Sequence, residues 1–370
     1  MNVRRIVRLL LFNAVLVVAV WMGLVLATAV VGDVYNFVKN NIKRGDDRSE
    51  MPNYADKQYA RDVFADIKKT IEDYQPYLAW RRKAMTTQYV NINEHGFRQH
   101  TEGPENNEAG ARTIGFFGGS TMWGTGVDDN GTIPAAFDQL TTDFEVTNYG
   151  EGGHNTRQML ALLINLIDTG QMPEVVVFYD GVNHIWTHCN YAVTRSLNGH
   201  MVERKLRRAL TENPRFGFTF QDVVLPPLEF VRRIVGEKKF VENEYACHDD
   251  PVRAAQVADT LVRIWDIAAV LVRHYGGEFY AFLQPVAYIG SARVDHLKFT
   301  RIHGAEQFRT VYPYVNAAID ERGLDWFADI SDAFDGTDEY IYIDRAHVTR
   351  NGNEIIARRM LEAMTDGAAR

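Results

Sequence analysis

Residues 112–126 read RTIGFFGGSTMWGTG, an apolar run that passes directly into a glycine-rich turn carrying Ser120. A short apolar run bounded by glycines predicts a buried strand that ends in a tight turn. A serine just past the end of such a strand is placed to act as an exposed nucleophile. A solvated serine in an ordinary glycine-rich turn accounts for this segment equally well when it is taken alone.

The residues of this segment exclude three known glycine-containing motifs. A phosphate-binding P-loop needs a lysine before its serine or threonine, and the segment contains none. The hydrolase elbow G-x-S-x-G needs glycine at position 122, which is Met122. A dinucleotide-binding fingerprint that begins at Gly124 needs glycine at position 129, which is Asp129.

More apolar runs follow along the chain, and helical patterns lie between them. The five predicted strands occupy residues 113–117, 144–148, 174–179, 277–283 and 325–330. The predicted helices occupy residues 132–141, 155–169, 253–274, 303–322 and 350–364. This alternation predicts an open parallel sheet with right-handed crossovers and helices on both faces. Ligands of such a sheet bind beyond the carboxyl ends of the strands, so the chemistry is expected in the loops that follow them.

The second predicted strand ends in NYGEGGHNT (148–156), which has three glycines within four positions. Such a segment exposes backbone N–H groups just before a helix N-terminus, where the helix dipole favours an anion. Asn155 or Thr156 acting as a plain helix cap is the alternative interpretation.

Two further strand ends carry polar side chains. After the third strand, Asn183 offers a side-chain amide that is a suitable donor to a developing oxyanion, with an Asx turn as the alternative. After the last strand, Asp344 and His347 lie three residues apart, so the carboxylate can orient the imidazole. A surface pair or half of a metal site explains this last motif as well.

Serine, glycine, asparagine and then aspartate with histidine therefore follow one another at four strand ends. In this order and spacing the chain resembles the SGNH hydrolases, also called GDSL-like esterases. The matching blocks are GGSTMWGTG, NYGEGGHNT, GVN and DRAH, and the resemblance covers residues 111–366. The chain departs from the family pattern at Gly119, before the serine, and at His184, after the asparagine; aspartate is common at both places.

The resemblance implies a three-layer, flavodoxin-like α/β fold with a five-stranded parallel sheet, and an enzyme that needs no cofactor. Ser120 would be the nucleophile, His347 its general base and Asp344 the residue that orients His347. Backbone N–H groups of Ser120 and Gly153 and the side chain of Asn183 would form the oxyanion hole. The expected activity is hydrolysis of acyl esters, above all acetyl esters of envelope carbohydrate. The alternatives are O-acyl transfer to a polysaccharide and a glycan-binding module that keeps the fold without activity.

The N-terminal segment is strongly apolar. From Leu9 to Gly32 it contains 24 residues without a charge, enough to cross a hydrocarbon core of about 30 Å as a helix. Ala27-Thr28-Ala29 has the form of a signal cleavage site, but the apolar run exceeds the roughly 7–15 residues of a signal peptide's apolar region. A retained transmembrane anchor is predicted. Basic residues flank both of its ends, so their count does not set the orientation, but the signal-anchor-like position with a short basic head favours a periplasmic or extracellular body.

These observations divide the chain into three predicted parts. They are an anchor at residues 1–33, a stalk and lead-in at 34–110, and a hydrolase domain at 111–370 with an insertion at 186–252. The lead-in contains an amphipathic helical pattern at 54–74 and the segment YVNINEHGFR (89–98), which resembles lead-ins of bacterial envelope members of the family. The insertion carries the basic run ERKLRR (203–208), interpreted either as a solvated helix face or as a contact for anionic headgroups or an acidic glycan.

The charge of the chain argues against a protein that binds nucleic acid. The 370 residues carry a net charge of −8, and residues 34–370 contain 37 basic and 47 acidic side chains. Neutralising phosphates needs a basic face, which an acidic body of this kind does not favour.

Cys189 and Cys247 are the only cysteines in the chain. In an oxidising compartment they are a candidate disulfide that ties down the insertion. With His184, His188 and His248 they could instead form a mixed metal site, although the zincin pattern H-E-x-x-H fails because position 185 is isoleucine. We expect the disulfide and no metal.

Overall fold

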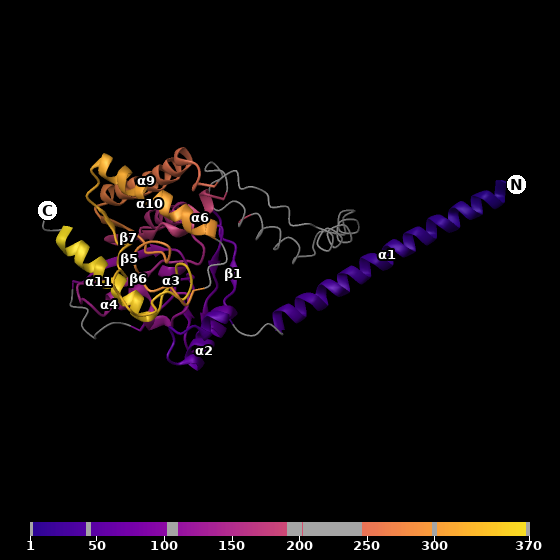
Figure 1. Cartoon of the computed structure of the whole chain (residues 1–370), viewed down its shortest axis with the longest axis horizontal. Coiled ribbons are helices and arrows are strands. Elements are labelled where there is room, and N and C mark those ends of the chain that lie inside the picture. The colour runs from indigo at the N-terminus through magenta and orange to yellow at the C-terminus, as the bar shows by residue number, and fades with distance from the viewer. Residues whose placement is uncertain are drawn as a thin grey trace. The chain divides into compact units, whose positions relative to one another are not determined.

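The computed structural model describes residues 3–41, 46–101, 110–190, 202, 246–297 and 302–367. The N-terminal helix belongs to one compact unit, and Gly45–Leu206 with Asn243–Arg370 form another (Figure 1). The part of this second unit that follows residue 110 is called the α/β body. Most of the predicted insertion, including the basic run at 203–208, lies outside the described residues.

Helix α1 (Val3–Asn41) is the first element of the chain. Its segment Val3–Val25 has a mean hydropathy of 2.2 and none of it is buried, so its length and composition suit a membrane span or a signal sequence. The predicted apolar helix at the N-terminus is therefore present, and it continues past residue 33 to Asn41.

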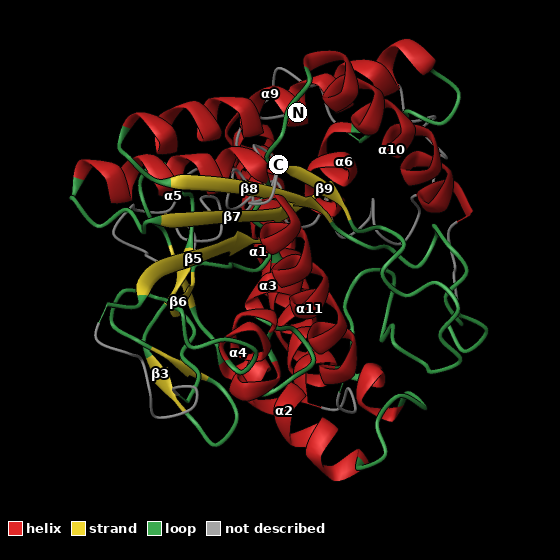
Figure 2. Ribbon diagram, turned by 90° about the vertical axis from the view of Figure 1, so that its left-hand side faces the viewer, coloured by secondary structure: helices red, strands yellow, loops and turns green. Residues whose placement is uncertain are grey.

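The α/β body is built on one five-stranded sheet, which Figure 2 shows. Its strands are β5 (Arg112–Gly118), β6 (Phe144–Asn148), β7 (Val175–Asp180), β8 (Glu278–Leu283) and β9 (Phe327–Asp329). Their order is β6-β5-β7-β8-β9, and all neighbours are parallel, which confirms the predicted α/β fold. This is the flavodoxin-like order, and its topological switch point lies between β5 and β7.

Helices cover both faces of this sheet (Figure 2). One layer contains α5 (Thr156–Asp168), α9 (Pro251–His274) and α10 (Ile302–Arg322), and the other contains α4 (Ile133–Asp138) and α11 (Arg350–Gly367). Along β7, Val176 and Phe178 pack in the first core, whereas Val175 and Val177 pack in the second. The pleat of the strand causes this alternation, and burial on both faces explains why residues 175–178 are all apolar.

Residues 46–101 pack on the α/β body instead of standing apart as a stalk. They form η1 (Asp47–Glu50), α2 (Lys57–Lys69) and the antiparallel pairs β1 (Glu72–Asp73) with β2 (Arg81–Arg82) and β3 (Met85–Thr86) with β4 (Asn91–Ile92). The predicted amphipathic helix is present as α2, and its Phe64 is buried with Ile343 of the body. Arg98 is only 1% exposed and pairs with Asp129 at an Nε–Oδ1 distance of 2.8 Å. The boundaries of the functional domains at 33 and 110 stay predictions.

Candidate active site

Ser120 begins α3 (Ser120–Trp123), a single helical turn that follows β5 after Gly119. Met122 of this turn is fully buried, which anchors the turn in the core. The turn ends at Gly124, whose φ of 96° is left-handed and whose missing Cβ leaves room for the guanidinium of Arg98. The half-buried Ser120 hydroxyl is thereby held at the carboxyl edge of the sheet, at the switch point.

His347 reaches Ser120 from the loop that precedes α11. Its Nε2 lies 2.7 Å from Ser120 Oγ, and its Nδ1 lies 2.7 Å from Oδ2 and 2.9 Å from Oδ1 of Asp344. An ionised carboxylate can only accept, so Nδ1 carries the hydrogen and Nε2 is left to accept the serine proton. The structure thus brings Ser120, His347 and Asp344 into one hydrogen-bonded line, although 227 residues separate the serine from the histidine.

Asp344 accepts hydrogen bonds from two side chains and two backbone groups. Its Oδ1 accepts the backbone N–H of Ala346 at 3.0 Å and of His347 at 2.9 Å. Its Oδ2 accepts His347 Nδ1 and, at 2.8 Å, Arg48 Nη1. Burial alone would raise the pKa of Asp344, but the charge of His347 and these hydrogen bonds hold that pKa well below its usual range. The carboxylate is therefore ionised and can stabilise an imidazolium.

Asn183 is the second residue of α6 (Val182–His188), which follows β7 after a glycine. Its Nδ2 donates to the carbonyl of His154 at 2.8 Å, and a Cβ added to Gly119 would collide with this nitrogen. The amide therefore lies beside the Gly119–Ser120 peptide, and glycine at position 119 makes room for it. Gly153, with a φ of 78°, directly precedes His154, so the three predicted oxyanion donors come from neighbouring loops.

The loop that carries Gly153 is fixed by residues 80–82 of the lead-in. Trp80 Nε1 donates to the carbonyl of Gly152 at 3.0 Å. Glu151, which has no exposed surface, forms a buried ion pair with Arg82 and accepts the backbone N–H of Arg82 at 3.0 Å. Sequence reasoning misses Trp80 and Arg82, because their partners lie 72 and 69 residues further along the chain and no local pattern marks them.

Several solved structures match this chain, although no protein-family model and no curated protein does. A carbohydrate acetylesterase family member from Sinorhizobium meliloti is 15% identical, with 70% of this chain and 100% of that chain covered and a TM-score of 0.36. A member of the lipolytic protein G-D-S-L family from Veillonella parvula is 15% identical, with 69% and 99% covered and a TM-score of 0.39. An acetylxylan esterase from Geobacillus stearothermophilus is 14% identical, with 70% and 96% covered and a TM-score of 0.37.

With identities of 14–15% and TM-scores of 0.36–0.39, these structures assign neither a family nor an activity to this chain. The chemistry of the site follows from its side chains.

His184, which stands where many GDSL-like esterases have aspartate, is fully buried. Its Nδ1 lies 3.1 Å from Thr156 Oγ1, and its Nε2 lies 3.3 Å from the carbonyl of Val257. Thr156 also donates a short hydrogen bond to Asp180, whose pKa burial raises to about 6. Burial also holds the pKa of His184 well below its usual value. The cluster joins the end of β7 to the N-termini of α5 and α6, so we assign it a structural role.

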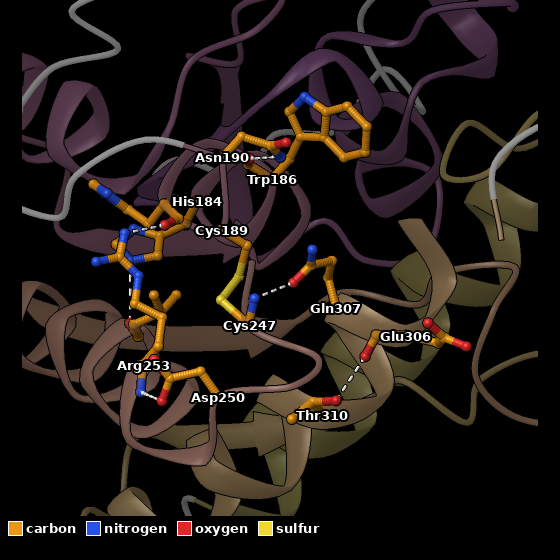
Figure 3. Close-up of a disulfide and its surroundings, with 12 residues drawn as sticks. His184, Trp186, Cys189, Asn190, Cys247, Asp250, Arg253, Glu306, Gln307 and Thr310 are labelled. Carbon is orange, nitrogen blue, oxygen red and sulfur yellow. Dashed lines mark hydrogen bonds between the residues drawn. A yellow bond between two sulfur atoms is a disulfide. The ribbon is translucent and has the colours of Figure 1, made fainter. Parts of the chain in front are cut away.

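Cys189 and Cys247 form a disulfide (Figure 3). It joins the residue after α6 to the chain just before α9, with the two Cα atoms 5.3 Å apart. Both cysteines are fully buried, and the backbone N–H of Cys247 donates to Gln307 Oε1 at 2.5 Å. Bonded sulfurs are not thiolate ligands, and the described residues contain no group of three or more His, Cys, Asp or Glu side chains that could hold a metal ion.

An aromatic and a basic side chain lie next to the predicted catalytic residues. Trp186 follows Asn183 by three residues in α6, so both side chains lie on the same face of the helix. Arg345 lies between Asp344 and His347 in the sequence, and its exposed guanidinium is 4.6 Å from the centre of the Trp186 ring. We call Trp186 and Arg345 the rim pair.

Proposed function

We propose that this protein is a serine esterase that cleaves acyl esters of carbohydrate through Ser120, His347 and Asp344. The observation that carries the proposal is the hydrogen-bonded line from Asp344 through His347 to Ser120, with the Asn183 amide beside the serine. Acid, base and nucleophile in this order are the arrangement that acyl transfer requires.

The first half of the reaction transfers the acyl group to the enzyme. Ser120 Oγ attacks the ester carbonyl carbon while its proton passes to His347 Nε2. The backbone N–H groups of Ser120 and Gly153 and the Asn183 amide stabilise the oxyanion of the tetrahedral intermediate. His347 then returns its proton to the leaving alkoxide, which departs as an alcohol. Asp344 stabilises the imidazolium and does not take up the proton.

The second half releases the acyl group. His347 takes a proton from water, and the resulting hydroxide attacks the acyl-serine carbonyl, so that the carboxylic acid leaves and Ser120 regains its proton. A sugar hydroxyl in place of water would give O-acyl transfer by the same residues. Incubation with acetylated envelope oligosaccharides distinguishes the two, because hydrolysis yields free acetate and transfer yields a newly acetylated sugar.

An active-site fluorophosphonate tests the nucleophile directly. We expect the wild-type chain to be labelled, and we expect the Ser120→Ala variant to lose labelling. The matched control is Ser331→Ala, which removes a serine outside the site and should leave labelling unchanged. Labelling that persists in Ser120→Ala would show that another residue is the nucleophile.

The rim pair supports carbohydrate as the alcohol part of the ester, because an aromatic face beside a charged donor suits a sugar ring. We expect Trp186→Ala to raise KM for an acetylated oligosaccharide roughly tenfold, since about 1.4 kcal/mol of contact energy is lost. The KM for ethyl acetate, which has no ring to pack on Trp186, should change less than twofold. Equal effects on both substrates would argue against a sugar contact at Trp186.

We further propose that α1 anchors the protein in a membrane and that the α/β body faces an oxidising compartment. The apolar segment Val3–Val25 and the buried disulfide support this placement. Thiol alkylation with a mass tag in acid-quenched cells tests it. Two tags should attach only after reduction, whereas tagging without reductant would indicate a reducing compartment.

A further inference from the structure

The residue Arg48 contacts the predicted triad from a part of the chain that lies outside the four matching blocks. It belongs to η1, shortly after the end of α1, and 296 residues separate it from Asp344. Its Nη1 lies 2.8 Å from Asp344 Oδ2, the oxygen that also accepts His347 Nδ1 at 2.7 Å. A single carboxylate oxygen is thus shared between the catalytic histidine and this arginine.

The Arg48 side chain is held in place before it meets Asp344. Its Nε and Nη2 donate to the two carboxylate oxygens of Asp46 at 2.9 and 2.7 Å, and its guanidinium lies 4.9 Å from the centre of the Phe64 ring. Asp46 Oδ1 also accepts the backbone N–H of Arg48 at 3.0 Å. A planar guanidinium bound on two edges is fixed in orientation, which a lysine ammonium cannot reproduce.

We propose that Arg48 is a positioning residue for the triad: it fixes the carboxylate of Asp344 against His347 and shares the negative charge of that carboxylate. The proposal rests on the proposed function, because it gives Arg48 a role only through the catalytic acid. Asp344 needs such a partner, since 28% of its side chain is exposed and its Oδ2 would otherwise be free to take water in place of a fixed donor.

The position of Arg48 has a second consequence. The same few residues lead from α1 into the α/β body, so a displacement of residues 46–48 from the body removes a donor from the triad. A soluble version of the chain that begins after Arg48 would keep every residue of the four family motifs and still lack this contact.

Steady-state kinetics of the full chain in detergent test the proposal, with 4-nitrophenyl acetate as the substrate. We expect Arg48→Ala to lower kcat roughly tenfold, the effect of losing one charge-assisted hydrogen bond in the transition state, with KM changed less than twofold. Arg48→Lys keeps the charge and should recover part of kcat. The matched control is Arg61→Ala, because Arg61 forms an exposed ion pair with Glu50 in the same lead-in and does not contact Asp344.

The pH profile separates positioning from a general loss of folding. Without Arg48, more of the Asp344 charge acts on the protonated imidazole, so the acid limb of kcat/KM should move to higher pH. Asp344 acts electrostatically on Asp46, Tyr54 and Tyr288, and Arg345 acts with it on Tyr288. These groups are present in every variant. An Arg48→Ala variant that unfolds cooperatively and keeps both kcat and the acid limb of the wild type would overturn the proposal.

A crystal structure of Arg48→Ala gives a readout that does not depend on activity. We expect the carboxylate of Asp344 to rotate, so that at least one of its two contacts with His347 Nδ1 is lost. An unchanged carboxylate would contradict the positioning role even if the wild type proves to be an esterase. Failure of the wild type to react with the fluorophosphonate would instead contradict the proposed function, and the rotation would still decide whether Arg48 positions Asp344.

Discussion

Around Ser120, single hydrogen bonds fix the direction of individual polar side chains. Asn183 is an example. Its side-chain nitrogen donates to the His154 carbonyl in the free protein and lies beside the Gly119–Ser120 peptide. The hydrogen bond to His154 fixes the direction of the amide and uses one of its two hydrogens, and the second hydrogen is the one that we propose donates to the oxyanion. A donor fixed before the reaction begins costs no reorganisation when charge develops on the substrate.

Asn183→Ala should lower kcat by roughly 10²- to 10³-fold, because one fixed donor to the oxyanion is lost while the triad is intact. Release of acetate from an acetyl ester measures the effect, and fluorophosphonate labelling reports whether Ser120 still reacts. Asn351→Ala serves as the control, since Asn351 is exposed and pairs with Glu339. Full turnover in Asn183→Ala would remove this residue from the oxyanion hole.

Asp180 should make the stability of the protein depend on pH. Burial raises its pKa from the ordinary 3.8 to about 6, so between these values the folded chain binds more protons than the unfolded chain. The contribution of this group to the free energy of unfolding therefore falls as pH rises from about 4 to about 6, by up to about 3 kcal/mol. Above this range the contribution is constant.

Urea unfolding of wild type and Asp180→Asn between pH 4 and 7.5 tests this prediction. The stability of the variant relative to the wild type should increase through the window and level off above it, because asparagine does not titrate. The control is Asp332→Asn, which makes the same replacement at an exposed ion pair with Arg359. A relative stability that does not change with pH would contradict the raised pKa.

At the scale of elements, local sequence patterns predict a strand or helix well when a single interaction, such as burial or helix capping, determines it. β7 was identifiable as an apolar run because both of its faces are buried, and α5 begins after Asn155, which forms a capping box with Gln158. The strand predicted at 325–330 is shorter, as β9 (Phe327–Asp329), because its pairing with β8 extends over residues 327–329. A run of apolar residues does not show where the hydrogen-bonded pairing of two strands ends.

The buried ion pair between Arg82 of the lead-in and Glu151, in the loop that carries Gly153, should be important for stability. Arg82→Met leaves the fully buried Glu151 carboxylate without its partner, which should lower the free energy of unfolding by about 3–5 kcal/mol. Lys83→Met is the neighbouring control, because Lys83 and Asp73 are 3.6 Å apart and both more than half exposed. Adding Glu151→Gln to Arg82→Met should restore part of the loss, and no recovery would show that the charge is not the cause.

At the scale of the whole molecule, the sequence predicts the candidate catalytic residues better than it predicts the residues that hold them in position. Ser120, Asn183, Asp344 and His347 each follow a strand, so the α/β pattern alone predicts that they meet at one edge. No sequence pattern identifies Arg48, because its contact with Asp344 joins distant segments and depends on tertiary packing. The amphipathic pattern of α2 likewise shows that the helix has an apolar face but not that this face packs on the body.

The disulfide should contribute to the stability of the body. Cys189 and Cys247 are 58 residues apart, so the double variant Cys189→Ser with Cys247→Ser should lose about 2–4 kcal/mol of unfolding free energy. Urea unfolding with and without reductant measures the loss. Reductant should lower the wild type to the level of the double variant and leave the variant unchanged. A wild type that is insensitive to reductant would show that the bond does not form.

The same disulfide makes the segment between its cysteines exchangeable. The covalent bond holds the two Cα atoms 5.3 Å apart, so the C-terminus of α6 lies close to the chain that leads into the N-terminus of α9. We expect a sequence of another length between the two cysteines to change the entropy of loop closure only slowly. The two cysteines therefore mark a position, near Asn183 in the sequence, at which a different binding segment could be introduced without changing the sheet.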